Sequence, residues 1–212
     1  MTSSTDLAAL LCSRLCHDML SPIGALNNGL ELLSAETDPE MRKRCLELLE
    51  QSAQISADKL KFFRLAYGAA GGFGEAVPVE EPRLLIEGLV AGNERLKLEW
   101  AVAEETLAKP VVKVLLNLAA IGIDTLIRGG TLAIGAEKRD GATEIAIRAA
   151  GPRIAFDANI GKALDGLLDE ADLSGRTAPA HLIRLLAAEC GGGVQYALTD
   201  EALIMGAILP DG

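Results

Sequence analysis

The sequence predicts an α+β protein. An N-terminal antiparallel helical hairpin is expected to form a dimeric four-helix bundle, and a two-layer α/β sandwich follows it. Apolar residues recur at helical spacing through residues 7–63, a glycine-rich stretch covers residues 68–74, and helical and strand periodicities then alternate to the end. We therefore predict a hairpin domain at residues 1–70 and a sandwich domain at residues 78–212, joined by a linker.

The first helix is expected from about Leu7 to Leu33. At about 100° per residue, one stripe of this helix carries its apolar side chains. The stripe consists of Leu11, Leu15, Met19, Pro22, Leu26, Leu30 and Leu33. His17 projects from nearly the opposite side, so we expect its side chain to be exposed.

A second helix follows a turn in which Asp38 is the expected N-cap and Pro39 the first helical residue. Its apolar positions are Met41, Cys45, Leu48, Ile55 and Phe62, widened by Leu49 and Phe63. Two helices alone would leave half of each apolar face uncovered. A second hairpin from another copy would cover both, so we predict a homodimer.

The rest of the chain mixes both periodicities. Helices are expected at residues 82–95, from Pro110 onward, at 160–168 and at 179–190. Strands are expected at residues 96–102, around 132–134 and 145–147, and at 194–198 and 203–209. Strands that pair mainly as hairpins, with the helices on one face, predict a two-layer sandwich.

Composition excludes several function classes. Half of the 212 residues are apolar, which is enough for a sizeable core. The net charge of −10 and the pI near 4.7 argue against nucleic-acid binding, because affinity for phosphate backbones requires concentrated Lys and Arg. The sequence contains neither a long apolar span nor the pattern of a signal peptide. We therefore expect a cytoplasmic protein with no membrane partner.

His17 is the candidate phosphoryl acceptor. An imidazole is nucleophilic near neutral pH because its ordinary pKa is about 6.5, and the adjacent carboxylate of Asp18 can orient it. From the first helix alone, a solvated histidine without a function is an equal alternative. Around His17 we predict a partner-binding surface of small or polar residues and one exposed leucine. This surface comprises Arg14, Leu20, Ser21, Gly24 and Asn28.

The cysteines do not predict a metal site. Cys12 and Cys16 are four residues apart next to His17, but no second Cys or His pair completes a ligand set. We expect both to be reduced, small apolar side chains, and we predict no bound metal. The second histidine, His181, lies in a helical pattern among leucines and is expected to be structural.

The order of these elements resembles that of bacterial histidine kinases, in which dimerising helices precede an ATP-binding sandwich of the Bergerat type. The residues that look like the phosphoacceptor box of that superfamily are His17, Asp18, Ser21, Pro22 and Ile23. Those that look like the region of its asparagine box are Asn117, Leu118, Gly129 and Gly130. The resemblance covers nearly the whole chain.

The kinase nucleotide site has lost its main groups here. One helical turn after Asn117, where such kinases hold magnesium with an asparagine, this chain has Ile121, which offers no oxygen to a hard cation. Ala149 stands in place of the adenine-binding aspartate, and Arg153 replaces a glycine. Residues 176–180 replace the glycine-rich lid with a segment containing proline. The resemblance implies a degenerate ATPase-like domain with no nucleotide cofactor.

This combination is similar to the ChpT-type bacterial histidine phosphotransferases. The resemblance implies a phosphotransferase of two-component signalling without autokinase activity. His17 would take a phosphoryl group from the receiver domain of a hybrid histidine kinase and pass it to the aspartates of response regulators, with Mg²⁺ supplied by the receiver.

The residues near His17 then have expected roles. Asp18 would orient or deprotonate the imidazole, Ser21 would donate a hydrogen bond or contact the partner, and Arg14 would face the phosphoryl group or an acidic partner. Pro22 lacks an N–H and leaves the carbonyl of Asp18 without its helical partner, so a local bend is expected. A purely structural kink is an equal interpretation of Pro22.

Two other functions stay open from the sequence. An active ATP-dependent histidine kinase would bind nucleotide and phosphorylate His17, and Ile121 and Ala149 speak against it. A non-catalytic module that binds response regulators would leave His17 incidental.

Overall fold

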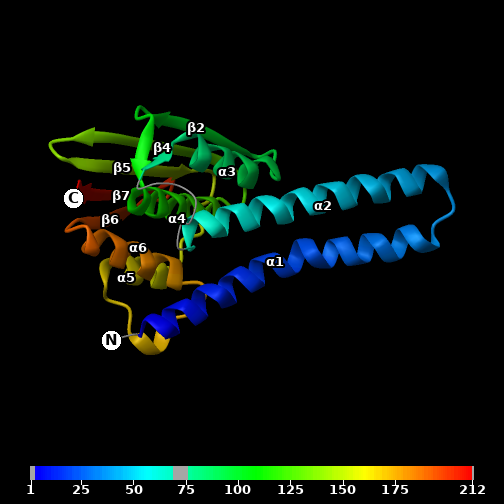
Figure 1. Ribbon diagram of the computed structural model, residues 1–212, viewed down its shortest axis with the longest axis horizontal. Helices are drawn as coiled ribbons and strands as arrows, with labels where there is room; N and C mark the ends of the chain where they lie inside the picture. Colours follow the sequence, from blue (N-terminus) through cyan, green and yellow to red (C-terminus); the bar gives the residue numbers. More distant parts are fainter. Residues whose placement is uncertain (1–2, 69–75, 212) are drawn as a thin grey trace.

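The computed structural model describes residues 3–68 and 76–211. Two long helices, α1 (Ser4–Ala35) and α2 (Pro39–Ala66), form an antiparallel hairpin whose far end projects from the rest of the molecule (Figure 1). The predicted hairpin is therefore confirmed, and α1 is longer than predicted at both ends. Ser3 accounts for the earlier start, because its hydroxyl accepts a hydrogen bond from the backbone N–H of Asp6 at 3.1 Å.

The hydrogen bonds that stabilise the turn between the two helices differ from the predicted cap. Asp38 occupies the N-cap position and Pro39 begins α2, but the Asp38 carboxylate makes no capping hydrogen bond. Glu36 Oε1 instead accepts from the next two backbone N–H groups, at 2.8 and 2.9 Å. Arg42 Nη1 donates to the carbonyls of Leu33 and Glu36 at 2.9 and 2.8 Å, which satisfies the end of α1.

A five-stranded sheet forms one layer of the second half of the chain. Its order is β2 (Leu96–Val102), β4 (Gly130–Arg139), β5 (Ala142–Ala150), β7 (Ala202–Pro210) and β6 (Gly193–Leu198). The β2–β4 pair is parallel and the other pairs are antiparallel. A separate antiparallel ribbon, which the sequence did not predict, joins β1 (Ala76–Pro78) to β3 (Thr106–Ala108).

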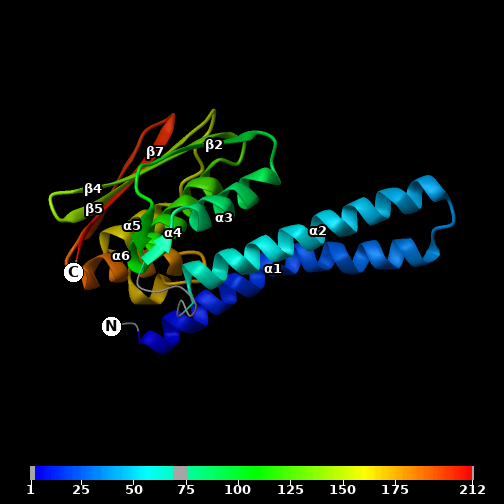
Figure 2. The same ribbon diagram turned by 45° about the horizontal axis from the view of Figure 1, so that its top comes forward.

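The helices of this half cover one face of the sheet (Figure 2). They are α3 (Glu80–Ala91), α4 (Lys109–Thr125), α5 (Ala158–Asp165) and α6 (Ala178–Glu189), with a short 3-10 helix η1 (Glu170–Asp172) before α6. The predicted helices and strands are present, and their ends differ from the predicted ends by a few residues. This arrangement confirms the predicted two-layer sandwich.

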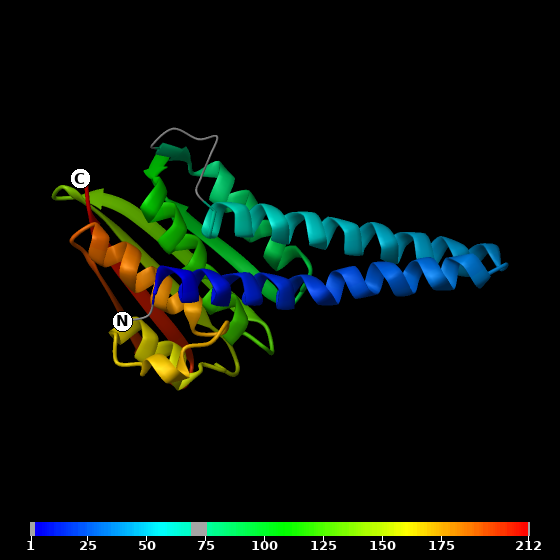
Figure 3. The same ribbon diagram turned by 60° about the horizontal axis from the view of Figure 1, so that its bottom comes forward.

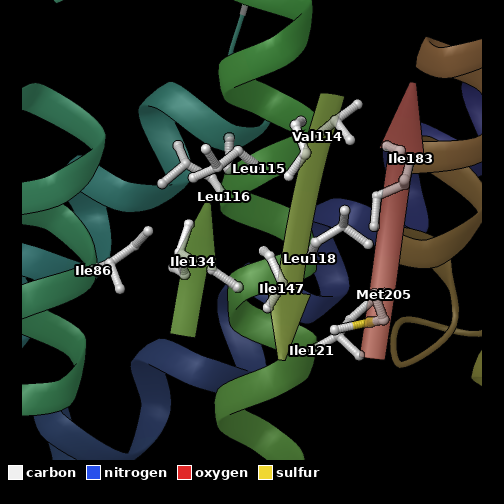
Figure 4. Close-up of a cluster of buried hydrophobic side chains, with 14 of the residues drawn as sticks. Ile86, Val114, Leu115, Leu116, Leu118, Ile121, Ile134, Ile147, Ile183 and Met205 are labelled. Carbon is white, nitrogen blue, oxygen red and sulfur yellow. The ribbon is translucent and has the colours of Figure 1, made fainter. Parts of the chain in front are cut away.

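The core lies between the sheet and α4, which is the most buried helix of the sandwich. Figure 4 shows Leu118 and Ile121 of α4 facing Ile147 of β5 and Met205 of β7. Aliphatic side chains supply most of this core, as the low aromatic content of the sequence predicts.

The base of the hairpin shares this core. Phe62, Phe63 and Ala66 of α2 belong to the same buried cluster as the sandwich, and α1 lies beside α6 (Figure 3). A Cβ on Gly175 would lie 3.3 Å from the carbonyl oxygen of Leu10, so the segment before α6 passes directly over α1. Of the predicted linker at residues 68–74, all but Gly68 lies outside the described residues.

None of the helices in the described part of the chain combines the length and the apolar content needed to cross a lipid bilayer.

Candidate functional site

His17 is presented to solvent by α1. Its side chain is 84% exposed, whereas Leu15 and Met19 of the same helix pack against the hydrophobic core and Pro22 is buried. The predicted exposure of His17 is thus confirmed. An exposed imidazole on a long helix can be reached by another protein without any rearrangement of this chain.

Asp18 holds one nitrogen of the His17 ring. The distance from His17 Nδ1 to Asp18 Oδ1 is 3.1 Å. An ionised carboxylate can only accept a hydrogen bond, so Nδ1 carries the proton in this contact and Nε2 keeps its lone pair. Nε2 is then the nucleophilic atom of the ring.

Arg14 links the hairpin to the sandwich. Its Nε donates to Asp18 Oδ2 and its Nη2 donates to Asp124 Oδ2, both at 2.7 Å. Burial lowers the pKa of Arg14, but the negative charges of Asp124 and Asp18 outweigh this effect and raise it above its ordinary value. The guanidinium therefore stays charged between two carboxylates of its own chain.

Sequence reasoning did not identify Asp124. It is the single acidic residue of α4 and lies near the end of this helix. A lone carboxylate on an otherwise buried helix was the available signal. However, nothing in the sequence indicated that it meets a residue 110 positions away.

A side chain of α2 hydrogen-bonds the backbone carbonyl that Pro22 leaves without its helical donor. Pro22 cannot donate to the carbonyl of Asp18, and Lys59 Nζ of α2 donates to that oxygen at 2.9 Å instead. Helix α1 also changes direction along its length (Figure 2). The backbone carbonyl of the residue next to His17 is therefore satisfied from the second helix of the hairpin.

The predicted partner-binding residues lie on the same helical face as His17, at spacings of three, four, seven and eleven residues. Leu20 is 70% exposed, and Ser21 and Asn28 are also exposed. Outside the backbone of α1 itself, no atom lies within 4 Å of where a Cβ on Gly24 would be. Arg14, the fifth predicted residue, forms ion pairs with Asp18 and Asp124 of its own chain. The partner contacts themselves stay predictions.

A cavity of about 520 Å³ opens beside His17, between α1 and the sandwich. His17 and Asp18 come to it from α1, Ile121 and Asp124 from α4, and Arg176 from the segment before α6. Arg176 Nε pairs with Asp157 Oδ2 at 3.2 Å.

Two residues at positions compared with the kinase nucleotide site belong to the hydrophobic core, and one of them, Ile121, also lines the cavity beside His17. Ile121 is 5% exposed and Ala149 is fully buried, both in the hydrophobic core. Asn117 is fully buried as well, and its Nδ2 donates to the carbonyl of Lys113 at 2.8 Å, within its own helix. The Oδ1 atom of Asn117 is buried and has no hydrogen-bond partner among the described residues.

Residues 176–180, which stand in place of the glycine-rich lid of the resembling kinases, lead into α6, and the first residues of this helix are buried. Ala178, Pro179 and Ala180 open α6 and are all buried. A Cβ on Gly175, just before them, would lie 3.4 Å from the backbone nitrogen of Arg14, so this segment passes close to α1.

The other candidate groups are the cysteines of α1 and the second histidine. Cys12 and Cys16 are exposed free thiols, and within residues 3–68 and 76–211 no group of three or more His, Cys, Asp or Glu side chains is arranged to hold a metal ion. His181 is partly buried. Its burial, together with the positive charge of Arg184, lowers its pKa below the ordinary value.

Comparisons with known proteins show which proteins this chain is similar to. Residues 79–202 match the family model described as the histidine phosphotransferase C-terminal domain. Protein phosphotransferase ChpT of Brucella abortus (strain 2308) is 33% identical over 205 residues, which make up 97% of this chain and 96% of that protein.

A solved structure supports the fold. One described as a bacterial phosphotransferase is 32% identical, covers 98% of each chain and superposes with a TM-score of 0.85. A match to the Acinetobacter baumannii histidine kinase AdeS covers 92% of this chain and 98% of that one, but at 17% identity and a TM-score of 0.48 it supports no statement about fold or activity.

Proposed function

This chain belongs to the histidine phosphotransferase family and is a protein phosphotransferase, and we propose that it relays a phosphoryl group through His17. The donor is the receiver domain of a hybrid histidine kinase, and the acceptors are the aspartates of response regulators. The observation that carries this proposal is the His17 ring, which is 84% exposed and has Nδ1 held by Asp18 at 3.1 Å.

The geometry suits nucleophilic transfer. The lone pair of His17 Nε2 attacks the phosphorus of the receiver's aspartyl phosphate and forms an N–P bond. The P–O bond to the aspartate breaks, and its electron pair stays on the released carboxylate. The ring gains positive charge, which the Asp18 carboxylate offsets while it keeps hold of the Nδ1 proton. Transfer to a response regulator reverses these bond changes with a second aspartate.

We propose that this chain performs the transfer without binding ATP. The proposal is supported by the buried apolar side chains of Ile121 and Ala149 and by the buried start of α6, which stand where the resembling kinases have an asparagine, an aspartate and a glycine-rich lid. In-line transfer depends mainly on positioning and charge stabilisation. We expect the Mg²⁺ for that stabilisation to arrive with the receiver domain.

We also propose that the protein acts as a homodimer. Three residues of the predicted apolar stripes, Leu30, Met41 and Leu48, are 56%, 43% and 57% exposed in the single chain. Solvent exposure of large side chains at the regular positions of two paired helices is typical of a bundle that lacks its second pair.

The test is transfer of label from a receiver domain carrying a radioactive aspartyl phosphate, with Mg²⁺ present and ATP absent. Wild-type protein is compared with His17→Ala and with His181→Ala, which removes the second of the two histidines as a matched control. We expect wild type and His181→Ala to be labelled equally and His17→Ala to stay unlabelled.

Other outcomes would support different functions. Equal labelling of His17→Ala would contradict the site. Stable binding of the phosphorylated receiver without transfer would favour a non-catalytic binding module. Labelling of His17 from radioactive ATP in the absence of any partner would favour an active histidine kinase.

A further inference from the structure

A continuous set of charged contacts runs from the sandwich to the acceptor ring. Asp124 Oδ2 accepts from Arg14 Nη2 at 2.7 Å, Arg14 Nε donates to Asp18 Oδ2 at 2.7 Å, and Asp18 Oδ1 lies 3.1 Å from His17 Nδ1. Arg14 and Asp18 each use one atom for the residue before them in this set and another atom for the residue after them. Asp124 is thus connected to His17 through two intermediates although it belongs to α4 and does not touch the ring.

The middle of this set is constrained and its two ends are accessible. The side chains of Arg14 and Asp18 are 21% and 19% exposed, whereas those of Asp124 and His17 are 55% and 84% exposed. A guanidinium is planar and holds its donors in a fixed geometry, so anchoring Nη2 on one carboxylate fixes the direction of Nε toward the other. With Arg14 in place, the Asp18 carboxylate cannot rotate without losing a 2.7 Å contact.

We propose that Asp124 is a positioning residue for phosphoryl transfer. It fixes Asp18 through Arg14, and Asp18 then keeps the proton of the His17 ring on Nδ1 and leaves Nε2 free to attack. This proposal rests on the proposed function and gives the sandwich a role in the chemistry at His17 besides its packing. Because a neutral ring can place its proton on either nitrogen, loss of the constraint would populate the unreactive form, in which Nε2 is protonated.

The test combines transfer kinetics with nitrogen NMR of the imidazole rings. The chain has two histidines, so His17→Ala assigns the spectrum directly. In Asp124→Ala we expect the rate of transfer at saturating phosphorylated receiver to fall roughly tenfold. We also expect a larger fraction of the His17 rings to carry the proton on Nε2, with the His181 signals unchanged.

Two further variants separate positioning from general effects. In the Arg14→Met background, Asp124→Ala should cause no additional loss of rate, because its connection to the ring is already broken. Glu87→Ala removes a comparable pair, with Arg83 at 2.9 Å on α3, and should change neither the rate nor the spectrum.

The proposal would be overturned by a full rate in Asp124→Ala, or by a reduced rate with unchanged His17 nitrogen signals. Additive losses in the double variant would also overturn it. These outcomes differ from failure of the proposed function, in which the wild-type protein itself would not be labelled on His17.

Discussion

Three atoms of Asp18 make polar contacts with other residues. Oδ1 holds the ring of His17, Oδ2 holds Arg14, and the backbone oxygen accepts from Lys59 because Pro22 has no N–H to offer it. The residue next to His17 therefore receives contacts from both helices of the hairpin and, through Arg14, from the sandwich. These contacts orient the ring of His17 although the ring itself faces solvent.

Tyr67 lies near Arg14 and Asp18, and the pKa of its phenol makes the stability of the protein depend on pH. Burial raises its pKa to about 12, with smaller opposing effects from Arg14 on one side and Asp18 and Asp124 on the other. The unfolded chain ionises this phenol near pH 10, while the folded chain keeps it neutral. The stability that Tyr67 contributes is thus complete below pH 10 and is lost as the pH rises from 10 to 12.

We therefore expect the free energy of unfolding of the wild type to fall relative to that of Tyr67→Phe between pH 10 and pH 12, by about 2 kcal/mol. Urea unfolding of both proteins at several pH values measures this difference. Phenylalanine keeps the ring that stacks on Phe63 at 5.5 Å. A constant difference between the two proteins across this range would contradict the assignment.

Among the elements, those with a strong periodic pattern could be predicted from the sequence. The hairpin and the helices and strands of the main sheet follow apolar spacing, and Pro39, Pro110 and Gly141 mark positions where elements begin or turn. The ribbon of β1 and β3 could not be predicted, because strands of three residues carry no measurable alternation. The cap by Arg42 was missed because a long side chain can reach several carbonyls, and the sequence does not specify which one.

Gly24 allows a prediction about α1 as an element. A methyl group at this position would meet nothing within 4 Å outside the helix backbone, and alanine is the better helix former. We expect Gly24→Ala to raise the free energy of unfolding by about 0.5–1 kcal/mol. We also expect slower phosphoryl transfer from the receiver domain, because the added methyl group lies on the predicted partner surface.

Denaturant unfolding and transfer assays on the same preparation test both parts. Gly141→Ala is the matched control. This glycine also has open space around it, but it adopts a φ of +78° in the turn between β4 and β5, so alanine should destabilise by about 1 kcal/mol and leave transfer unchanged. Unaltered transfer in Gly24→Ala would remove Gly24 from the partner surface.

At the scale of the whole molecule, the sequence identified His17 and Asp18 but not the connection that joins them to the sandwich. Their type, order and helical phase were sufficient to predict an exposed acceptor with a neighbouring carboxylate. The contact between Arg14 and Asp124 depends on how the hairpin packs against α4, and no local pattern specifies such a docking geometry.

The proposed dimer makes a prediction about assembly. Leu48 is 57% exposed on α2, and a second hairpin would bury it. We expect the full-length protein to sediment as a dimer and Leu48→Glu to shift it toward monomer, since a carboxylate is costly inside a bundle. Leu84→Glu, at a position 55% exposed on α3, should remain dimeric. A monomeric wild type at micromolar concentration would contradict the assembly.

Locating the transferred phosphoryl group tests the central claim most directly. The full-length protein is incubated with an aspartyl-phosphorylated receiver domain and Mg²⁺, without ATP, and the modified residue is identified by peptide mass spectrometry at neutral pH. We predict an acid-labile phosphoryl group on His17. A phosphoryl group found on any other residue would contradict the account. An unmodified protein, in a reaction where the receiver loses its phosphoryl group to water alone, would also contradict it.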